Sequence, residues 1–144
     1  MATTVITQAT VINEGQRHQQ DVLIRDGLIA EIGADLTGKA DEVIDGSGQW
    51  LLPGMIDDQV HFRDPGLTHK GSIATESKAA VAGGTTTFMD MPNVNPTTTT
   101  LEALEAKHAH ASKVAWANYS FYLGATNDNI EEVKALDPNA ACGV

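Results

Sequence analysis

The sequence predicts an α/β protein in which an all-β segment precedes alternating strands and helices. Two observations predict this class. Residues 3–50 contain short β-branched runs separated by turn signals such as Asp26-Gly27. From about residue 53 onward, strand-like runs alternate with segments of helical periodicity. Such alternation is typical of a parallel sheet with right-handed crossovers.

In the N-terminal segment, residues 5–12 are rich in Thr, Val and Ile and predict a strand. Residues 21–33 predict a hairpin, because two apolar runs flank Asp26-Gly27. Residues 42–46 predict another short strand that ends at a glycine. Strands this close together indicate a small β-sandwich or part of one.

The second part begins near Pro53-Gly54. Strands are expected at about 55–62, 85–91 and 118–124, with a fourth that has only begun at 141–144. Helices are expected at 71–82, about 99–113 and 129–136, the first stopped by Gly83-Gly84. Three or four strands cannot close a barrel, which needs roughly 250 residues. The residues alone therefore leave a small open sheet or the front part of something longer.

Composition excludes several classes of partner. The 144 residues carry 9 basic and 19 acidic side chains, for a net charge of −10. Nucleic acids and anionic membranes demand a basic surface, so neither is an expected partner. The start lacks a signal peptide, and no apolar run reaches the ~20 residues of a membrane span. The single cysteine, Cys142, allows no internal disulfide. We expect a cytoplasmic protein.

Four polar residues alternate along the first strand of the second part: Asp57, Gln59, His61 and Arg63. Side chains of a strand point to opposite faces with period two. The four polar groups would then share one face, and the apolar residues between them would enter the core: Ile56, Val60 and Phe62. A carboxylate, an amide, an imidazole and a guanidinium in one row indicate a metal and anion site.

Each of these side chains has its own chemistry. His61 is the best metal ligand, because a neutral imidazole binds zinc well. The neutral amide oxygen of Gln59 is a poor zinc ligand and suits Mg²⁺ or Ca²⁺ better. Asp57 either binds a metal or orients a ligand by hydrogen bonding. Arg63 matches a carboxylate bidentately, or else forms a surface ion pair with Asp64 or Asp58.

Further candidates lie after the second strand and on the following helix. Asn93 lies between Pro92 and Pro96, in a rigid loop that suits an amide presented to a ligand; the alternative is an ordinary turn. His108 and His110 are two residues apart on a predicted helix, so they face different directions. We expect both on the surface.

Two stretches carry a family resemblance. Pro53-Gly54-Met55-Ile56-Asp57-Asp58-Gln59-Val60-His61-Phe62-Arg63-Asp64-Pro65-Gly66 resembles the first metal motif of the dihydroorotases, in the cyclic amidohydrolase branch of the amidohydrolase superfamily. Residues 82–96, which include Met91-Pro92-Asn93, are similar to their second motif. The two motifs are less decisive among dihydroorotase, allantoinase and dihydropyrimidinase, although Phe-Arg-Asp-Pro-Gly and Met-Pro-Asn favour dihydroorotase.

The resemblance implies the N-terminal part of a (β/α)₈ TIM-type barrel preceded by a small β-sandwich segment. Residues 1–52 would be half of a composite sandwich domain, and residues 53–144 would be the first βα units of the barrel. It also implies one or two Zn²⁺ ions, a homodimer, and reversible ring opening of dihydroorotate to carbamoyl aspartate in pyrimidine biosynthesis. His61 would match the second metal histidine, and Arg63 and Asn93 would bind the substrate carboxylate.

Two departures from the family follow. Gln59 replaces the usual first metal histidine, which leaves a single-metal site or a weakened pair as alternatives. The other metal ligands and the proton-shuttling aspartate of the family belong to later strands, so this segment alone is expected to be inactive.

In related sequences a lysine would follow Val144, and in several cyclic amidohydrolases it is carboxylated and bridges two metals. We expect a modified lysine there, in a chain of roughly 400 residues or more. A measured mass near 15.2 kDa would contradict this expectation. Allantoinase-like or dihydropyrimidinase-like activity, or a non-catalytic assembly partner, are the alternative functions.

Overall fold

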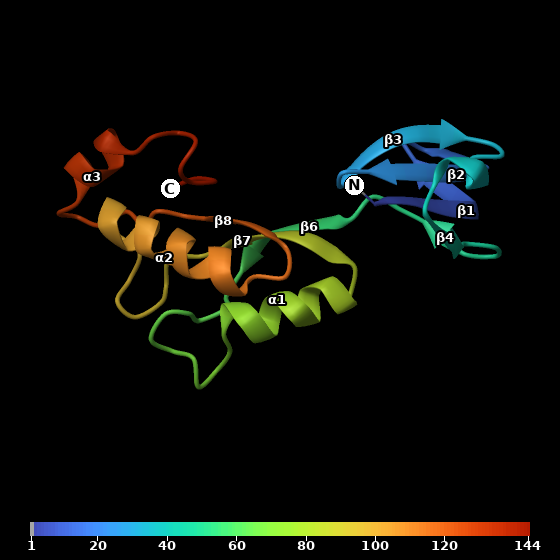
Figure 1. Ribbon diagram of the computed structural model, residues 1–144. Coiled ribbons are helices and arrows are strands. Elements are labelled where there is room, and N and C mark those ends of the chain that lie inside the picture. The colour runs from blue at the N-terminus through green and yellow to red at the C-terminus, as the bar shows by residue number, and fades with distance from the viewer. Residues whose placement is uncertain (1) are drawn as a thin grey trace. The chain divides into compact units, whose positions relative to one another are not determined.

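The computed structural model describes residues 2–144, and the chain divides into two compact units between Pro53 and Gly54. Each unit is built around a sheet of its own (Figure 1). The two units are therefore described separately.

The first unit is a mixed five-stranded sheet. Its elements are β1 (Thr3–Asn13), β2 (Gln16–Arg25), β3 (Leu28–Gly33), a 3₁₀ turn (Thr37–Lys39), β4 (Glu42–Asp45) and β5 (Trp50–Leu51). The order is β3-β2-β1-β4, and β5 also pairs with β1. β1, β2 and β3 run antiparallel in turn, whereas β4 and β5 lie parallel to β1.

Of the two hairpins in this sheet, one was predicted from the sequence and the other was not. The predicted hairpin around Asp26-Gly27 is confirmed, and both turn residues have positive φ, 54° and 75°. A second hairpin joins β1 to β2 through Glu14 (φ 49°) and Gly15 (φ 73°). Sequence reasoning missed it, because Gln16 to Gln20 are polar and do not resemble a strand.

The second unit is a three-stranded parallel sheet with helices between its strands, as the α/β prediction requires. Its elements are β6 (Met55–Val60), α1 (Ile73–Ala82), β7 (Thr85–Asp90), α2 (Leu101–Val114), β8 (Asn118–Phe121) and α3 (Ile130–Ala135). The strand order is β6-β7-β8. Helix α1 packs on β7, and α2 packs on β8.

Local side-chain chemistry sets where the helices begin. Ser72 accepts a hydrogen bond from the backbone N–H of Thr75, and the Thr75 hydroxyl accepts one from the Ser72 N–H. This reciprocal capping satisfies two backbone donors at the start of α1. Thr100 caps α2 by accepting from the N–H of Ala103. At the other end of α1, Gly84 has φ +92°, which a side chain would resist.

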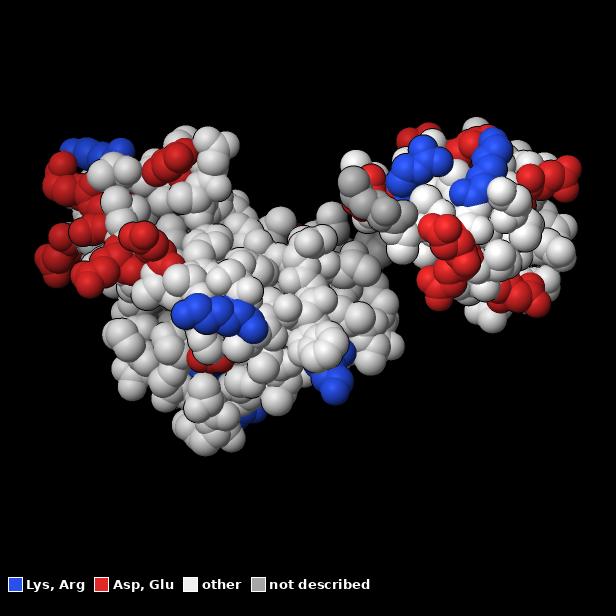
Figure 2. All heavy atoms as spheres, in the orientation of Figure 1, with Lys and Arg blue, Asp and Glu red and all other residues white. Residues whose placement is uncertain are grey.

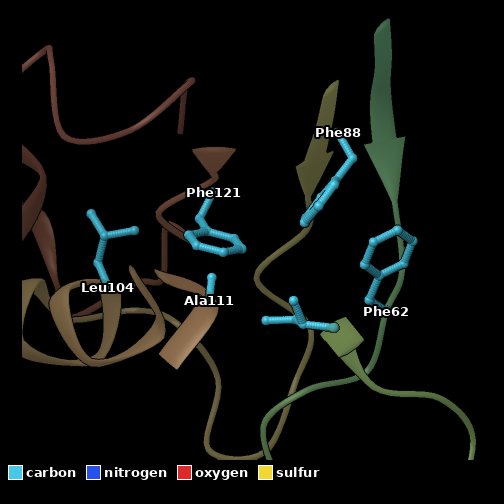
Figure 3. Packing of buried hydrophobic residues seen from close by; sticks show 6 residues of the cluster. Phe62, Phe88, Leu104, Ala111 and Phe121 are labelled. Carbon is cyan, nitrogen blue, oxygen red and sulfur yellow. The ribbon is translucent and has the colours of Figure 1, made fainter. Parts of the chain in front are cut away.

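The core of the second unit is aromatic (Figure 3). Phe62 and Phe88 have ring centroids 4.6 Å apart, and Phe121 meets Phe88 edge-on at 6.5 Å. The rest of the buried cluster is aliphatic: Ile73, Leu104 and Ala111. These residues come from α1, from α2, and from the chain in or next to the three strands. Their burial therefore fixes the strands against these two helices.

The structure corrects three expectations about strands and faces. β6 ends at Val60, and the ladder with β7 shifts register between Asp57 and Val60, so the expected strict alternation through Arg63 does not hold. Ile56, expected in the core, is 62% exposed, since the helices of this unit pack on β7 and β8. The expected fourth strand is a single bridge between Tyr122 and Gly143.

The surface of the second unit has an uneven charge distribution. Figure 2 shows acidic side chains gathered around α3. Among residues 2–144, no helix has both the length and the apolar character needed to cross a bilayer.

Candidate active site

Three of the predicted site residues, His61, Arg63 and Asn93, follow the carboxyl ends of β6 and β7. These strands are parallel neighbours, so the chain segments that leave them emerge at the same edge of the sheet. The N–H of Met91 donates to the carbonyl of Val60 at 3.0 Å, which is the last backbone contact before the two segments leave the sheet. His61 follows one strand directly, and Asn93 follows the other by three residues.

His61 and Asn93, 32 residues apart in sequence, meet side chain to side chain. The imidazole Nδ1 lies 2.9 Å from Oδ1 of Asn93. Because an amide oxygen only accepts hydrogen bonds, this contact places the imidazole proton on Nδ1. The lone pair of Nε2 is then free to bind a metal ion, as in metal sites where the second ring nitrogen donates to a neighbouring oxygen.

The loops that carry these side chains pack against each other. The N–H of Asn95 donates to the carbonyl of Pro65 at 3.1 Å. Gly66 has φ +80°, and a Cβ there would lie 1.7 Å from the carbonyl oxygen of Asn95. Only glycine allows this approach, so Gly66 holds the loop after Arg63 beside the loop after Asn93.

Arg63 lies in this first loop rather than on the strand. It is half-buried with φ +67°, and its carbonyl accepts from the N–H of Leu67 at 3.0 Å. Among the described residues, the structure shows no ion pair between Arg63 and the neighbouring acidic residues Asp58 and Asp64. Its guanidinium is therefore not committed to the surface pair that was the alternative interpretation.

Gln59 and Asp57 are both exposed, before the end of β6. Asp57 Oδ1 accepts from the N–H of Gln59 at 3.2 Å, a local contact that does not engage His61. Gln59 lines an open cavity of about 400 Å³, together with its β6 neighbour Asp58 and with residues beyond β7 and β8: Met91, Pro92, Tyr122, Leu123, Gly124, Ala125 and Val144. The Tyr122 hydroxyl donates to the carbonyl of Asp58 at 3.0 Å and so forms one wall of this cavity.

A structural metal site needs several donor side chains close together. Within residues 2–144 there is no group of three or more His, Cys, Asp and Glu side chains placed to hold one. His61, with its proton held on Nδ1, suits a metal. Asp57, Asp58 and Gln59 are the side chains of β6 with oxygen donors. The described residues therefore supply one imidazole suited to a metal ion, but not a complete set of ligands.

Sequence reasoning missed the buried polar contacts that support these loops. Asp90 and Lys107 form an ion pair of 2.7 Å buried beneath them. Asp64 is buried and accepts from the N–H of Ile73 and from Nε2 of His110, both at 3.1 Å. The signal for Lys107 was its position on α2, because Leu104, Lys107 and Ala111 form the buried stripe of that helix.

His108 also departs from its expected place on the surface. It is half-buried, its Nε2 lies 2.9 Å from the carbonyl of Ala140, and its ring meets Phe121 edge-on at 4.8 Å. Nearby, burial raises the pKa of the Cys142 thiol above its ordinary value, although hydrogen bonding opposes this. Among the described residues, neither forms a hydrogen bond with His61 or Asn93.

Comparisons with known proteins place the chain among cyclic amide hydrolases. The family model described as dihydro-orotase-like matches residues 48–141. A dihydroorotase of Lactobacillus helveticus is 49% identical over 138 residues, which is 92% of this chain and 32% of that protein. An allantoinase of Desulfitobacterium hafniense is 36% identical over 97% of this chain and 31% of its own length.

Among solved structures, an L-hydantoinase (dihydropyrimidinase) from Arthrobacter aurescens superposes with a TM-score of 0.91 and 30% identity, over 99% of this chain and 32% of that one. A D-hydantoinase superposes with a TM-score of 0.77 and 34% identity. These neighbours are TIM-barrel amidohydrolases, which confirms the expected fold class. The chain spans about a third of the length of the relatives it matches, 30–32% of each. Because the family model covers more than half of its residues, the chain belongs to the dihydro-orotase-like family.

Proposed function

We propose that the protein carrying this chain is a metal-dependent cyclic amidohydrolase that opens the ring of dihydroorotate reversibly, in pyrimidine biosynthesis. The observation that carries the proposal is the contact between His61 and Asn93, 2.9 Å across the two motifs. It brings a metal-binding imidazole next to an amide in a loop that also faces the arginine loop. The curated dihydroorotase at 49% identity supports the choice of substrate.

In this proposal Arg63 and Asn93 bind the carboxylate of the substrate and orient its ring. The guanidinium offers paired N–H donors that match a carboxylate, and Asn93 can donate through its Nδ2 while Oδ1 stays with His61. His61 would hold the metal through Nε2, with Gln59 and Asp57 as further candidate ligands. A bound zinc ion would supply a Lewis acid and lower the pKa of water toward ~7.

The test compares Arg63→Ala with Arg25→Ala, a matched control at the exposed end of β2. Loss of a charged partner costs about 2–5 kcal/mol, so Arg63→Ala should lower kcat/KM for dihydroorotate at least about 30-fold. Arg25→Ala should leave it within twofold. Equal small effects from both substitutions would contradict the role of Arg63.

A second candidate substrate class is supported by a specific observation. The solved L-hydantoinase superposes at a TM-score of 0.91, and an allantoinase aligns over 97% of the chain. Assays with dihydroorotate, allantoin and dihydrouracil side by side separate these possibilities. A free carboxylate on the preferred substrate is expected, because Arg63 has no anionic partner among the described residues.

A non-catalytic assembly partner is the third possibility, because Gln59 stands where the family usually has a histidine. Metal analysis of the purified protein separates it from the enzyme. We expect near-stoichiometric zinc, and a chelator should abolish activity. Protein that binds no metal and turns over none of the three amides would favour the assembly partner.

A further inference from the structure

A buried ion pair lies where both motif strands leave the sheet. Asp90 is the last residue of β7, and Lys107 lies in the middle of α2. Their side chains are 0% and 1% exposed, and Nζ lies 2.7 Å from Oδ2. No other ion pair in residues 2–144 is buried on both sides.

Both partners of this pair also bind backbone atoms of the two motifs. Oδ1 of Asp90 accepts from the N–H of Phe62 at 2.9 Å, and Phe62 lies between His61 and Arg63. Nζ of Lys107 donates to the carbonyl of Met91 at 3.2 Å, two residues before Asn93. The ammonium also lies 4.8 Å from the centroid of the Phe121 ring. One pair thus holds the backbone on either side of the candidate site.

We propose that Asp90 and Lys107 are positioning residues, which fix the backbone of the two motifs so that the His61 and Asn93 side chains meet. The consequence for turnover rests on the proposed function. The expected effect on the His61–Asn93 contact does not rest on the proposed function, because it follows from the geometry alone.

Stability is a poor explanation for this pair. Removing two charges from water is costly, and replacing a buried ion pair with well-packed apolar residues is often neutral or stabilising. A pair of this kind is better explained where charge-assisted hydrogen bonds must hold specific backbone atoms. Here Phe62 N–H and Met91 C=O are those atoms, and each lies next to or within two residues of a candidate site residue.

Three variants of the intact protein test the proposal. Lys107→Met removes the ammonium but keeps an unbranched stem beside Phe121. Asp90→Asn removes the charge and can still accept from the Phe62 N–H. Lys107→Arg keeps the charge. Lys134→Met is the matched control, because it breaks the exposed pair between Lys134 and Glu131 on α3.

The first measurement is the ¹⁵N shift of the His61 ring nitrogens, calibrated with Asn93→Ala, which removes the contact. In Lys107→Met and Asp90→Asn the Nδ1 shift should move toward that of Asn93→Ala. The second measurement is turnover: kcat/KM should fall about tenfold, mostly through kcat, because misplaced groups weaken the transition state. Lys107→Arg should restore part of the His61 Nδ1 shift and part of kcat/KM. Lys134→Met should change neither quantity.

A purely structural pair would give a different result. The variants would unfold at lower temperature, yet below that temperature the His61 shift would equal that of the unaltered protein; this outcome overturns the proposal. If the single variants do not fold, hydrogen exchange of the unaltered protein decides. The Phe62 amide should exchange as slowly as that of Phe88, and much faster exchange would overturn the proposal.

The same data distinguish this inference from the proposed function. Unaltered protein without activity on any of the three amides contradicts the proposed function. A His61 shift that still moves in Lys107→Met would support the positioning role even then.

Discussion

The two units bury apolar side chains in different ways. The second unit surrounds Phe88 with Phe62 and Phe121, and two helices cover β7 and β8. The first unit has a small aliphatic cluster of Val5, Leu23 and Leu36. Its sheet leaves Leu28, Ile29, Val43, Ile44 and Trp50 exposed, the first of them at 72%. The layered α/β unit therefore buries an aromatic core between sheet and helices, whereas the single sheet leaves many of its apolar side chains exposed.

This contrast bears on the expectation that residues 1–52 are half of a composite sandwich. Contiguous exposed apolar side chains on a sheet usually mark a surface that packs against something else. The composite domain stays a prediction, and the exposed side chains of β3, β4 and β5 are the surface that it would cover. All residues of the candidate site, in contrast, belong to the second unit.

The largest expected effect comes from removing the central ring of the second unit. Phe88 is fully buried between two other phenylalanines, so Phe88→Ala should lower the free energy of unfolding by about 3–5 kcal/mol. Leu23→Ala, in the smaller core, should cost about 2–3 kcal/mol, the lower part of the usual range, because its cluster is small and the site can collapse. Urea unfolding measures both.

The tryptophans allow the two units to be followed separately. Trp50 lies in the first unit and Trp116 in the second. With Trp116→Phe or Trp50→Phe as background, fluorescence reports one unit at a time. If Phe88→Ala lowered the urea midpoint at Trp50 as much as at Trp116, the units would unfold together and the comparison between them would fail.

Much of the fold and part of the site could be predicted from the sequence. Thr100 as a helix cap and Asp26-Gly27 as a turn were predictable because their effects are local. The row from Asp57 to Arg63 was predicted as one strand face, but the register shift after Asp57 depends on pairing with β7. The buried position of Lys107 was not predicted, because it depends on an ion pair with Asp90, 17 residues earlier in the sequence.

A medium effect is expected from two buried carboxylates, one in each unit. Asp21 accepts from the N–H groups of Gln8 and Leu36, at 2.8 and 3.0 Å. Asp64 accepts from the N–H of Ile73 and from His110. Alanine at either position leaves buried backbone donors unpaired and should cost about 1–3 kcal/mol of stability.

The two carboxylates should differ in their effect on activity. Asp64 adjoins Arg63, so Asp64→Ala should also reduce kcat/KM, whereas Asp21→Ala should leave it unchanged in folded protein. Enzyme assays at a temperature where both variants are folded measure this. Equal losses of activity would mean that the first unit supports the site as strongly as the second.

The smallest effect is expected from an exposed carboxylate of the first unit. Hydrogen bonds from the backbone N–H and the hydroxyl of Thr3, both 2.9 Å long, hold the pKa of Asp41 below its ordinary 3.8. A depressed folded-state pKa stabilises the protein above the unfolded value, and this contribution is lost as the pH falls through 3.8 and below. In Asp41→Asn, the free energy of unfolding should therefore fall less steeply as the pH drops through 3.8 and below. Near pH 7 it should change little beyond the effect of the weakened hydrogen bonds. Thermal unfolding between pH 3 and pH 7, read at Trp50, measures the difference; an acid profile identical to that of the unaltered protein would show that the contact between β1 and β4 does not persist in solution.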